Sequence, residues 1–122
     1  MTLDELGTYI TTHFEADTDH PIPKEPTVTV FRRLDNKKWF AATKNIGCRS
    51  VDVDRSGRID ILNVKLEPRL VTSLRGREGF RPAWNMNRNN WVTILLDGTV
   101  PDAEIYGYLD QAFADAGASK RR

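Results

Sequence analysis

The chain has 122 residues, of which 39% are hydrophobic and 29% are charged, and its formal net charge is +1. This length supports one hydrophobic core and is too short for two ordinary domains. No apolar run approaches the roughly 20 residues that a membrane-spanning helix needs. We therefore expect a single soluble domain over residues 1–119, followed by a basic tail at 120–122, with no membrane association.

The N-terminal ten residues contain two acids and no base, whereas a secretory signal begins with positive charge and continues into an apolar stretch. Cys48 is the only cysteine, so an intrachain disulfide is excluded. Both observations favour a reducing, cytoplasmic location.

Charge is distributed unevenly along the chain. Residues 1–30 carry a net charge of −5, residues 31–96 carry +8, residues 97–119 carry −5 and the last three residues carry +3. A basic centre between acidic ends has two interpretations. The bases either solvate strands and loops that lie between acidic helices, or they form a face that attracts phosphate.

The first predicted element is a helix over residues 3 to about 14. Thr2 and Glu5 have the spacing of a capping box, and apolar residues then recur at intervals of three and four. The segment "EADTDHPIPKEP", residues 15–26, holds three prolines and no periodicity, so it is predicted to be an extended connection.

Four short β-branched and aromatic runs follow. "TVTVFRR" and "KKWFAATK" flank a tight turn and predict one hairpin, and "SVDV" and "RIDILNVKL" flank "DRSG" and predict a second. The simplest arrangement is an antiparallel meander. A further strand is predicted for "WVTILL", residues 91–96.

Two more helices are predicted. Pro68 can open a helix of about two turns that ends at Gly76. The last helix is expected to be capped by Thr99 and to end at Gly117, with one apolar face that has to cover a sheet. The predicted fold class is α+β, an antiparallel sheet of about five strands packed by N- and C-terminal helices.

The residue types and spacings needed for catalysis or for a resident metal are missing. The segment from Asp52 to Asp60 imitates a calcium loop, but its twelfth position is Asn63, and Arg55 and Arg58 place positive charge inside it. His13, His20 and Cys48 lack zinc-ligand spacing, and the sequence contains no nucleophile elbow or glycine-rich phosphate loop. We expect a protein without enzymatic activity, metal or cofactor.

The stretch "RPAWNMNRNNW", residues 81–91, concentrates arginine, asparagine and tryptophan. These types suit phosphate contact, base-edge contact and stacking on an unpaired base, but they also suit a loop that covers a core. Trp39 and Trp91 lie inside predicted strands and are expected to be buried, Trp91 between the sheet and the last helix. The location of Trp84 stays open.

The segment "PAWNMNRNNWVTILLDGTVPDAEI", residues 82–105, resembles the C-terminal signature of the MmcQ/YjbR family. In that signature Pro-Ala-aromatic-His-Met-Asn-Lys precedes a Trp-led strand, an Asp-Gly turn and a Val-Pro-Asp helix start. The likeness extends over nearly the whole chain. Asn85 stands where the family usually has His, and Arg88 stands where it usually has Lys.

The resemblance implies a frataxin-like (CyaY-like) architecture, which has been likened to the double-wing motif of a phage transcription factor. It also implies a DNA-binding protein. We therefore expect a non-enzymatic DNA-binding module that contacts duplex DNA through a basic sheet face, is a monomer and is a candidate transcriptional regulator. The residues expected to contact DNA are Lys37, Lys38, Arg58, Lys65, Arg81, Trp84, Asn85, Asn87 and Arg88.

An alternative function belongs to a different class. A frataxin-like domain could instead bind a small ligand, a protein or iron. For iron, the candidate ligands are the acids of the N-terminal region, namely Asp4, Glu5, Glu15, Asp17 and Asp19.

Overall fold

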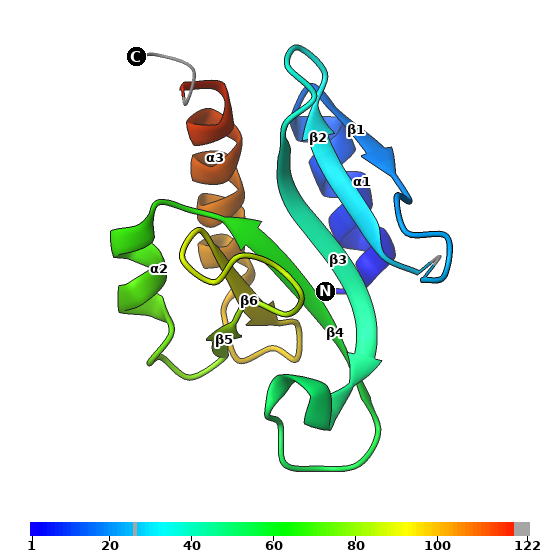
Figure 1. Cartoon of the computed structure of the whole chain (residues 1–122), viewed down its shortest axis with the longest axis vertical. Helices are drawn as coiled ribbons and strands as arrows, with labels where there is room; N and C mark the ends of the chain where they lie inside the picture. The colour runs from blue at the N-terminus through cyan, green and yellow to red at the C-terminus, as the bar shows by residue number, and fades with distance from the viewer. Residues whose placement is uncertain (26, 119–122) are drawn as a thin grey trace.

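The structure is a computed structural model that describes residues 1–25 and 27–118. Six antiparallel strands form one sheet in the order β1-β2-β3-β4-β6-β5 (Figure 1). The elements in chain order are α1 (Leu3–His13), β1 (Ala16–Asp19), β2 (Thr29–Arg33), β3 (Trp39–Gly47), η1 (Cys48–Val51), β4 (Arg58–Lys65), α2 (Pro68–Leu74), β5 (Phe80–Pro82), β6 (Trp91–Leu95) and α3 (Asp102–Ala118).

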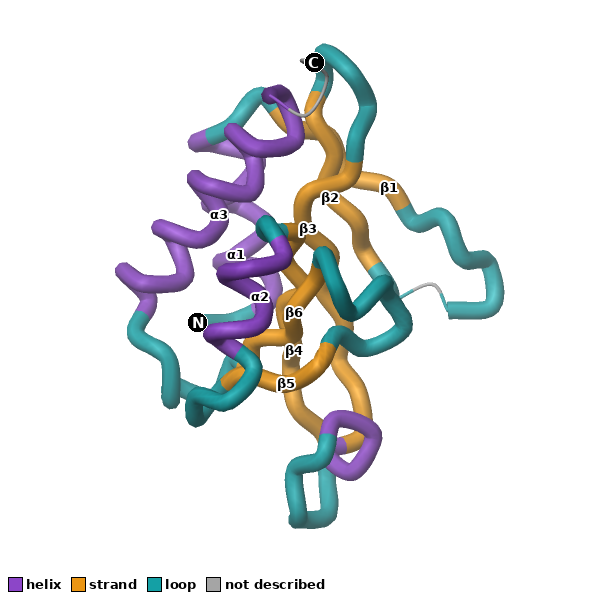
Figure 2. Tube along the Cα trace, turned by 60° about the vertical axis from the view of Figure 1, so that its left-hand side comes forward, coloured by secondary structure: helices purple, strands orange, loops and turns teal. Residues whose placement is uncertain are grey.

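The sheet has helices on one face only. In Figure 1, α1 and α3 pass behind the strands, while the loop of residues 83–90 lies in front of them. Figure 2 shows the same two layers from the side, with α1, α2 and α3 together on one side of the strands. The main core lies between the layers and includes Leu6, Ile10, Phe31, Phe40, Leu62, Val64, Val92, Ile94, Ile105 and Leu109.

Helix α1 begins as the sequence predicts. The Thr2 hydroxyl accepts a hydrogen bond from the Glu5 amide at 3.1 Å, and the Glu5 carboxylate accepts one from the Thr2 amide at 2.8 Å. The capping box is therefore confirmed. The helix buries Leu6 and Ile10 completely, which fixes the face that packs on the sheet.

Strand β1 is a difference from the prediction, because residues 16–19 fall in the segment expected to be an extended connection. This edge strand pairs with β2, and its two aspartates, Asp17 and Asp19, lie 3.6 and 3.5 Å from the Arg32 guanidinium. "ADTD" has no apolar run to indicate a strand. Pairing and cross-strand charge stabilise it, and both depend on β2 lying beside it.

Residues 50–53 were predicted to form a strand, and that prediction is wrong. Cys48–Val51 form a 3-10 turn, and Asp52 then adopts a left-handed conformation with φ of 58°. Strand β3 instead runs on to Gly47 and pairs directly with β4. The short strand β5 was also not predicted; it pairs with the edge of β6 and ends at Pro82, which suits an edge position.

The two later helices lie close to the expected positions. Helix α2 has Pro68 at its start, as predicted. Helix α3 begins at Asp102, with the amides of Glu104 and Ile105 bonded to the Pro101 carbonyl, so Thr99 lies in the preceding turn and does not cap it. The predicted basic tail at 120–122 lies outside the described residues.

Candidate functional site

The sheet face opposite α1 and α3, called here the helix-free face, is the candidate site. Side chains alternate along a strand, so if Leu62 and Val64 of β4 face the helices, Ile61, Asn63 and Lys65 face away from them. Antiparallel register then places the cross-strand partners of these residues on the same face. They are Ala42, Lys44, Trp91, Thr93 and Leu95.

The loop of residues 83–90 crosses this face and is fastened to it by a buried polar triad. The Asn63 amide nitrogen donates to the Trp84 carbonyl at 2.8 Å, and the Trp84 amide donates to the Thr93 hydroxyl at 2.9 Å. The Thr93 hydroxyl in turn donates to the Asn63 side-chain oxygen. Asn63 is 3% exposed and Thr93 is fully buried, so each hydrogen bond forms away from water.

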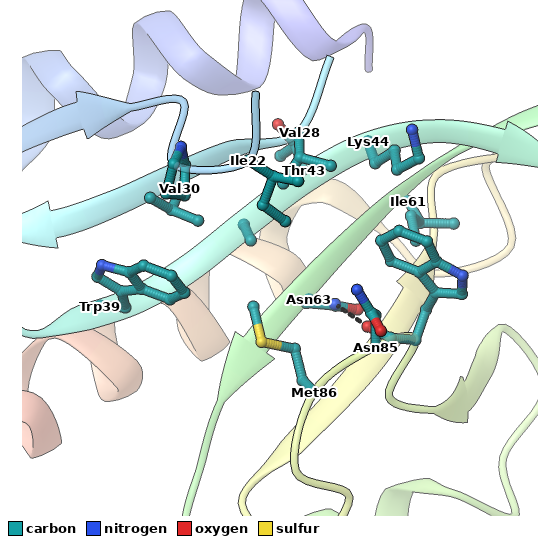
Figure 3. Close-up of a pocket in the computed structure, with 13 residues that line it drawn as sticks. Ile22, Val28, Val30, Trp39, Thr43, Lys44, Ile61, Asn63, Asn85 and Met86 are labelled. Carbon is teal, nitrogen blue, oxygen red and sulfur yellow. Dashed lines mark hydrogen bonds between the residues drawn. The ribbon is translucent and has the colours of Figure 1, made fainter. Parts of the chain in front are cut away.

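An apolar pocket of about 70 Å³ opens between this loop and the strands. Trp39 of β3 and Met86 of the loop both line the pocket (Figure 3), and Trp84 of the loop lines it as well. Further apolar walls come from the 21–28 connection and the strands: Pro21, Ile22, Val28, Val30, Ala42 and Ile61. Few polar groups placed among apolar walls are typical of a ligand-binding pocket.

Lys44 is an almost buried lysine at this pocket, with 9% of its surface exposed. Its ammonium lies 2.7 Å from the Glu25 carboxylate and donates to the Thr27 hydroxyl at 3.1 Å. It also lies 5.7 Å from the centre of the Trp84 ring. The carboxylate balances the charge of Lys44, so the pair makes this wall electrically neutral.

Asn85 stands at the pocket rim in the left-handed region, with φ of 57°. Asparagine tolerates this conformation better than other side-chain-bearing residues. The side chain is exposed, and its amide has no hydrogen-bond partner within the described part of the chain. One side-chain donor and acceptor pair is therefore available at the pocket.

Three of the predicted DNA-contacting bases lie on this side of the sheet. Lys65 and Arg81 project from β4 and β5 on the helix-free face by register, and Arg88 belongs to the loop. Arg81 and Arg88 donate to nearby carbonyls, those of Phe80 at 2.9 Å and Ala83 at 3.3 Å. None of the three forms an ion pair with any residue that the structure describes.

The other predicted bases lie elsewhere. The prediction that all of them share one basic sheet face is therefore wrong. Lys37 and Lys38 lie in the turn between β2 and β3, at one end of the sheet. Arg58 begins β4 on the same side as Leu62, and its guanidinium bonds to the side chain and carbonyl of Asn45. Because side chains alternate along β4, Arg58 and Lys65 point to opposite faces of the sheet.

Asn87 has a structural role in the loop. Its side-chain oxygen accepts from the Asn89 amide at 2.9 Å, and its carbonyl accepts from the amides of Asn90 and Trp91. These bonds form the turn that leads into β6. The oxygen of this side chain, which was predicted to contact DNA, is therefore already engaged by the loop itself.

Two tryptophans do not lie as expected. Trp91 is buried, with 7% exposed, but alternation with Val92 and Ile94 places it on the helix-free face rather than beneath α3. Trp39 is 37% exposed, although it was predicted to be core. An irregularity between Phe31 and Arg32 lets Phe40 turn to the core while Trp39 faces the pocket.

The acids proposed as iron ligands do not converge. Asp4 and Glu5 lie in the first turn of α1, and Asp17 and Asp19 are held by Arg32. Within residues 1–25 and 27–118, no group of three or more histidines, cysteines, aspartates or glutamates could hold a metal ion. In the same residues, no helix has the length and apolar character needed to cross a bilayer.

Sequence reasoning missed three residues that build this site: Lys44, Asn63 and Thr93. Asn63 interrupts the apolar run "ILNVKL", and a polar residue inside a buried strand indicates a specific hydrogen-bonding role. Lys44 offers no comparable signal, because it ends the predicted strand "KKWFAATK" and a lysine there is ordinarily exposed. Its burial depends on the 21–28 connection folding over it.

Comparison with known proteins gives consistent relatives. A family model described as YjbR matches residues 12–114. Protein YyaQ of Bacillus subtilis is 31% identical over 113 residues, which cover 93% of this chain and 96% of YyaQ. Protein YjbR of Escherichia coli is 34% identical over 56 residues, which cover 45% of this chain and 48% of that protein.

A crystal structure of a protein from Pseudomonas syringae has the same fold. It superposes with a TM-score of 0.90 at 33% identity, over 95% of this chain and 99% of that one. The similarity includes nearly the whole of both chains, so the overall fold is shared.

Proposed function

This chain belongs to the YjbR family, and from that premise we propose that it is a non-enzymatic DNA-binding protein that contacts duplex DNA with part of its helix-free face. The relatives named above carry no assigned activity. The proposal therefore rests on the charges and contacts of this chain. The proposal includes the frataxin-like architecture, with its likeness to the double-wing motif, that the sequence resemblance implies.

The observation that carries the proposal is the set of three bases without acidic partners: Lys65, Arg81 and Arg88. They occupy the half of the helix-free face formed by β4, β6, β5 and the loop. Arginine and lysine side chains that are free of carboxylates can neutralise backbone phosphates and release counterions. This half of the face is therefore the part suited to a polyanion.

The ion-paired acids of the same face support this assignment, because they lie toward β1 and none of them is paired with Lys65, Arg81 or Arg88. Arg32 holds Asp17 and Asp19 at the β1 edge, and Lys44 holds Glu25 beside the pocket. Negative charge is thus concentrated toward β1, at the opposite end of the strand order from β5. DNA is expected to approach the β5 side and to avoid the β1 side.

Phosphate contacts are expected to dominate over base reading. Asn87 is engaged in the loop, and the Trp84 backbone is fixed by the polar triad. Of the predicted amides, the whole Asn85 side chain is available at the site, whereas Asn87 has its side-chain oxygen bonded within the loop. An interface of this kind gives weak sequence preference and strong salt dependence.

The test is a salt titration of binding to a random-sequence duplex of about 20 base pairs, followed by fluorescence anisotropy. The key variant replaces Lys65, Arg81 and Arg88 with alanine. A matched control replaces Lys37, Arg55 and Arg58, which are exposed bases that lie at the ends of the sheet or on the other side of it. Both variants lose the same formal charge.

The parent should bind at about 50 mM salt, and its log–log salt plot should be linear with a slope of about −0.9 for each phosphate contact. The key variant should bind more weakly and lose roughly 2.7 from the magnitude of the slope, while the control variant should change little. Equal losses in the two variants would show attraction to net charge alone. No binding by the parent would exclude the proposal.

Two further expectations belong to this proposal. We propose a cytoplasmic location, where duplex DNA is accessible, and we expect the protein to act as a monomer. The alternative of a small-ligand domain is favoured by a separate observation, the apolar pocket, whose walls do not include Lys65, Arg81 or Arg88.

A further inference from the structure

The pocket beside the loop, called here the indole pocket, is built for recognition independently of the three bases. It is lined by Trp39, Trp84 and Met86 and by aliphatic side chains from four separate segments (Figure 3). A polar triad holds the loop that forms one wall. An ordinary gap over a sheet would not need a fully hydrogen-bonded anchor of this kind.

Its volume limits what can enter. An apolar cavity of roughly 150 Å³ accommodates a whole benzene molecule, whereas the indole pocket provides about 70 Å³. A single ring can therefore enter by one edge, with the opposite edge left at the rim. A bicyclic ring or a bulky aliphatic chain exceeds this space.

The charge at the pocket favours a neutral ligand. Lys44 is balanced by Glu25 at 2.7 Å, so the wall has no unpaired positive charge to attract an anion. Asn63 has both side-chain atoms engaged, the nitrogen with Trp84 and the oxygen with Thr93. A charged ligand would have to displace the partners of Lys44 or Asn63. That displacement would leave buried polar groups without hydrogen bonds.

Asn85 supplies the hydrogen-bonding group that remains. Its side chain offers an N–H donor beside a C=O acceptor, and no described residue occupies either one. The complement of this pair is another amide-like edge, an N–H beside a carbonyl. A ligand whose inner edge is apolar and whose outer edge is amide-like satisfies both the walls and the rim.

We propose that the indole pocket binds a pyrimidine base of the thymine type, with its C5 methyl group between the apolar walls and its N3–H and O2 edge at Asn85. In this pose the two tryptophans and Met86, which line the pocket, would contact the ring and the methyl group. The base can come from a free nucleoside or from an unpaired position in a nucleic acid. Both sources present the same pyrimidine ring to the pocket, and the experiment below distinguishes them.

Binding is measured by NMR on the indole Nε1–H signals of Trp39 and Trp84, with Trp91 as an internal reference because it does not line the pocket. The probes are thymidine, deoxyuridine, deoxycytidine and deoxyadenosine. Thymidine should give saturable shifts of the two pocket indoles. It should bind about fourfold more tightly than deoxyuridine, the gain expected for burying one methyl group.

Deoxycytidine lacks the N3–H donor and deoxyadenosine is bicyclic, so both should bind at least about tenfold more weakly than thymidine, the cost of a lost or mispaired hydrogen bond. A thymidine pentanucleotide, compared with the same strand carrying abasic sites, tests the nucleic-acid source. Tighter binding of the pentanucleotide than of thymidine assigns the pocket to a base within a strand. Equal binding assigns it to the free nucleoside.

Asn85→Gly removes the side-chain amide and keeps the left-handed backbone accessible, and Asn89→Ala is the matched loop control because Asn89 does not line the pocket. Asn85→Gly should weaken thymidine binding about tenfold, and Asn89→Ala should leave it unchanged. Ala42→Val, which adds volume inside the pocket, should weaken every probe. Folding of each variant is checked by its melting curve.

The proposal is overturned by the absence of saturable shifts with either thymidine or the pentanucleotide. It is also overturned by equal affinity for all four nucleosides or by unchanged affinity in Asn85→Gly. Duplex binding in the salt titration depends on Lys65, Arg81 and Arg88, none of which lines the pocket. Failure of the pocket proposal therefore leaves the duplex proposal standing, and the reverse also holds.

Discussion

The side-chain amide of Asn63 on β4 donates to the main-chain carbonyl of Trp84 at 2.8 Å, and this buried bond joins the sheet to the loop that crosses it. The same side chain accepts from Thr93 on β6, so one asparagine links a strand, its neighbour and the loop. The position of the Trp84 ring, and therefore one wall of the indole pocket, depends on this contact.

We predict that Asn63→Leu lowers the free energy of unfolding by about 2 to 3 kcal/mol, because the Trp84 carbonyl and the Thr93 hydroxyl both lose a buried partner. The measurement is urea denaturation, together with hydrogen exchange of the Trp84 amide, which should become faster. Asn45→Leu is the control, since Asn45 is only half-buried and its bonds to Asp60 and Arg58 lie toward solvent. Equal costs for the two variants would contradict the triad's role.

Replacement of the tryptophans should separate core from rim. Trp91→Ala is expected to cost about 3 to 5 kcal/mol, because a 7% exposed indole leaves a large cavity. Trp39→Ala is expected to cost about 1 kcal/mol or less, since 37% of that residue already contacts water. Thermal or denaturant unfolding of the two variants under the same conditions checks this order, and a reversed order would refute it.

A pH effect is expected at the turn between β2 and β3. The Arg33 guanidinium donates to both oxygens of Asp35, at 2.9 and 2.7 Å, and these hydrogen bonds lower the pKa of the carboxyl group to about 2. In the unfolded chain the pKa is about 3.9. The contribution of this pair to stability is therefore present above about pH 4 and is lost as the pH falls toward 2.

The pKa of Asp35 can be read from the pH dependence of its carboxyl carbon shift in NMR. A midpoint near 2 is expected in the parent protein. In Arg33→Lys, which keeps the charge and loses the two-pronged geometry, the midpoint should rise toward the usual aspartate range. A parent midpoint near 4 would show that the pair is not formed in solution.

Gly79 and Gly98 provide a matched pair of glycine substitutions. Both have a positive φ, 93° and 92°, so alanine is strained at either position. At Gly79 an added Cβ would also lie 2.6 Å from Cγ2 of Val100, whereas at Gly98 it would have no described atom within 4 Å beyond the adjoining residues. Gly79→Ala should therefore destabilise the protein by about 1 to 3 kcal/mol more than Gly98→Ala, the usual cost of overpacking. Denaturant midpoints of the two variants provide the comparison.

The sequence was sufficient for the elements that carry a strong local signal. Helix α1 has its capping box, α2 has its initial proline and β4 has a long apolar run, and all three lie where they were expected. The YjbR resemblance was also correct. These features depend on near neighbours in the chain, so a short window contains the necessary information.

Local signals were weaker where neighbouring strands determine the structure. Residues 16–19 form a strand because β2 provides hydrogen bonds and Arg32. Residues 50–53 turn away although their composition suits a strand, because β3 continues to Gly47 and already pairs with β4. Strand pairing is a long-range contact, and composition alone does not specify it.

The sequence by itself determined which residues carry charge and that Trp91 would be buried. The tertiary structure decided to which face of the sheet each of these side chains points. Alternation along β4 turns Lys65 toward the helix-free face and Arg58 away from it, and the irregularity beside Arg32 turns Trp39 outward. A shift of one residue in register exchanges the two faces of a strand. The grouping of three unpaired bases and the formation of the indole pocket therefore depend on the register of the assembled sheet.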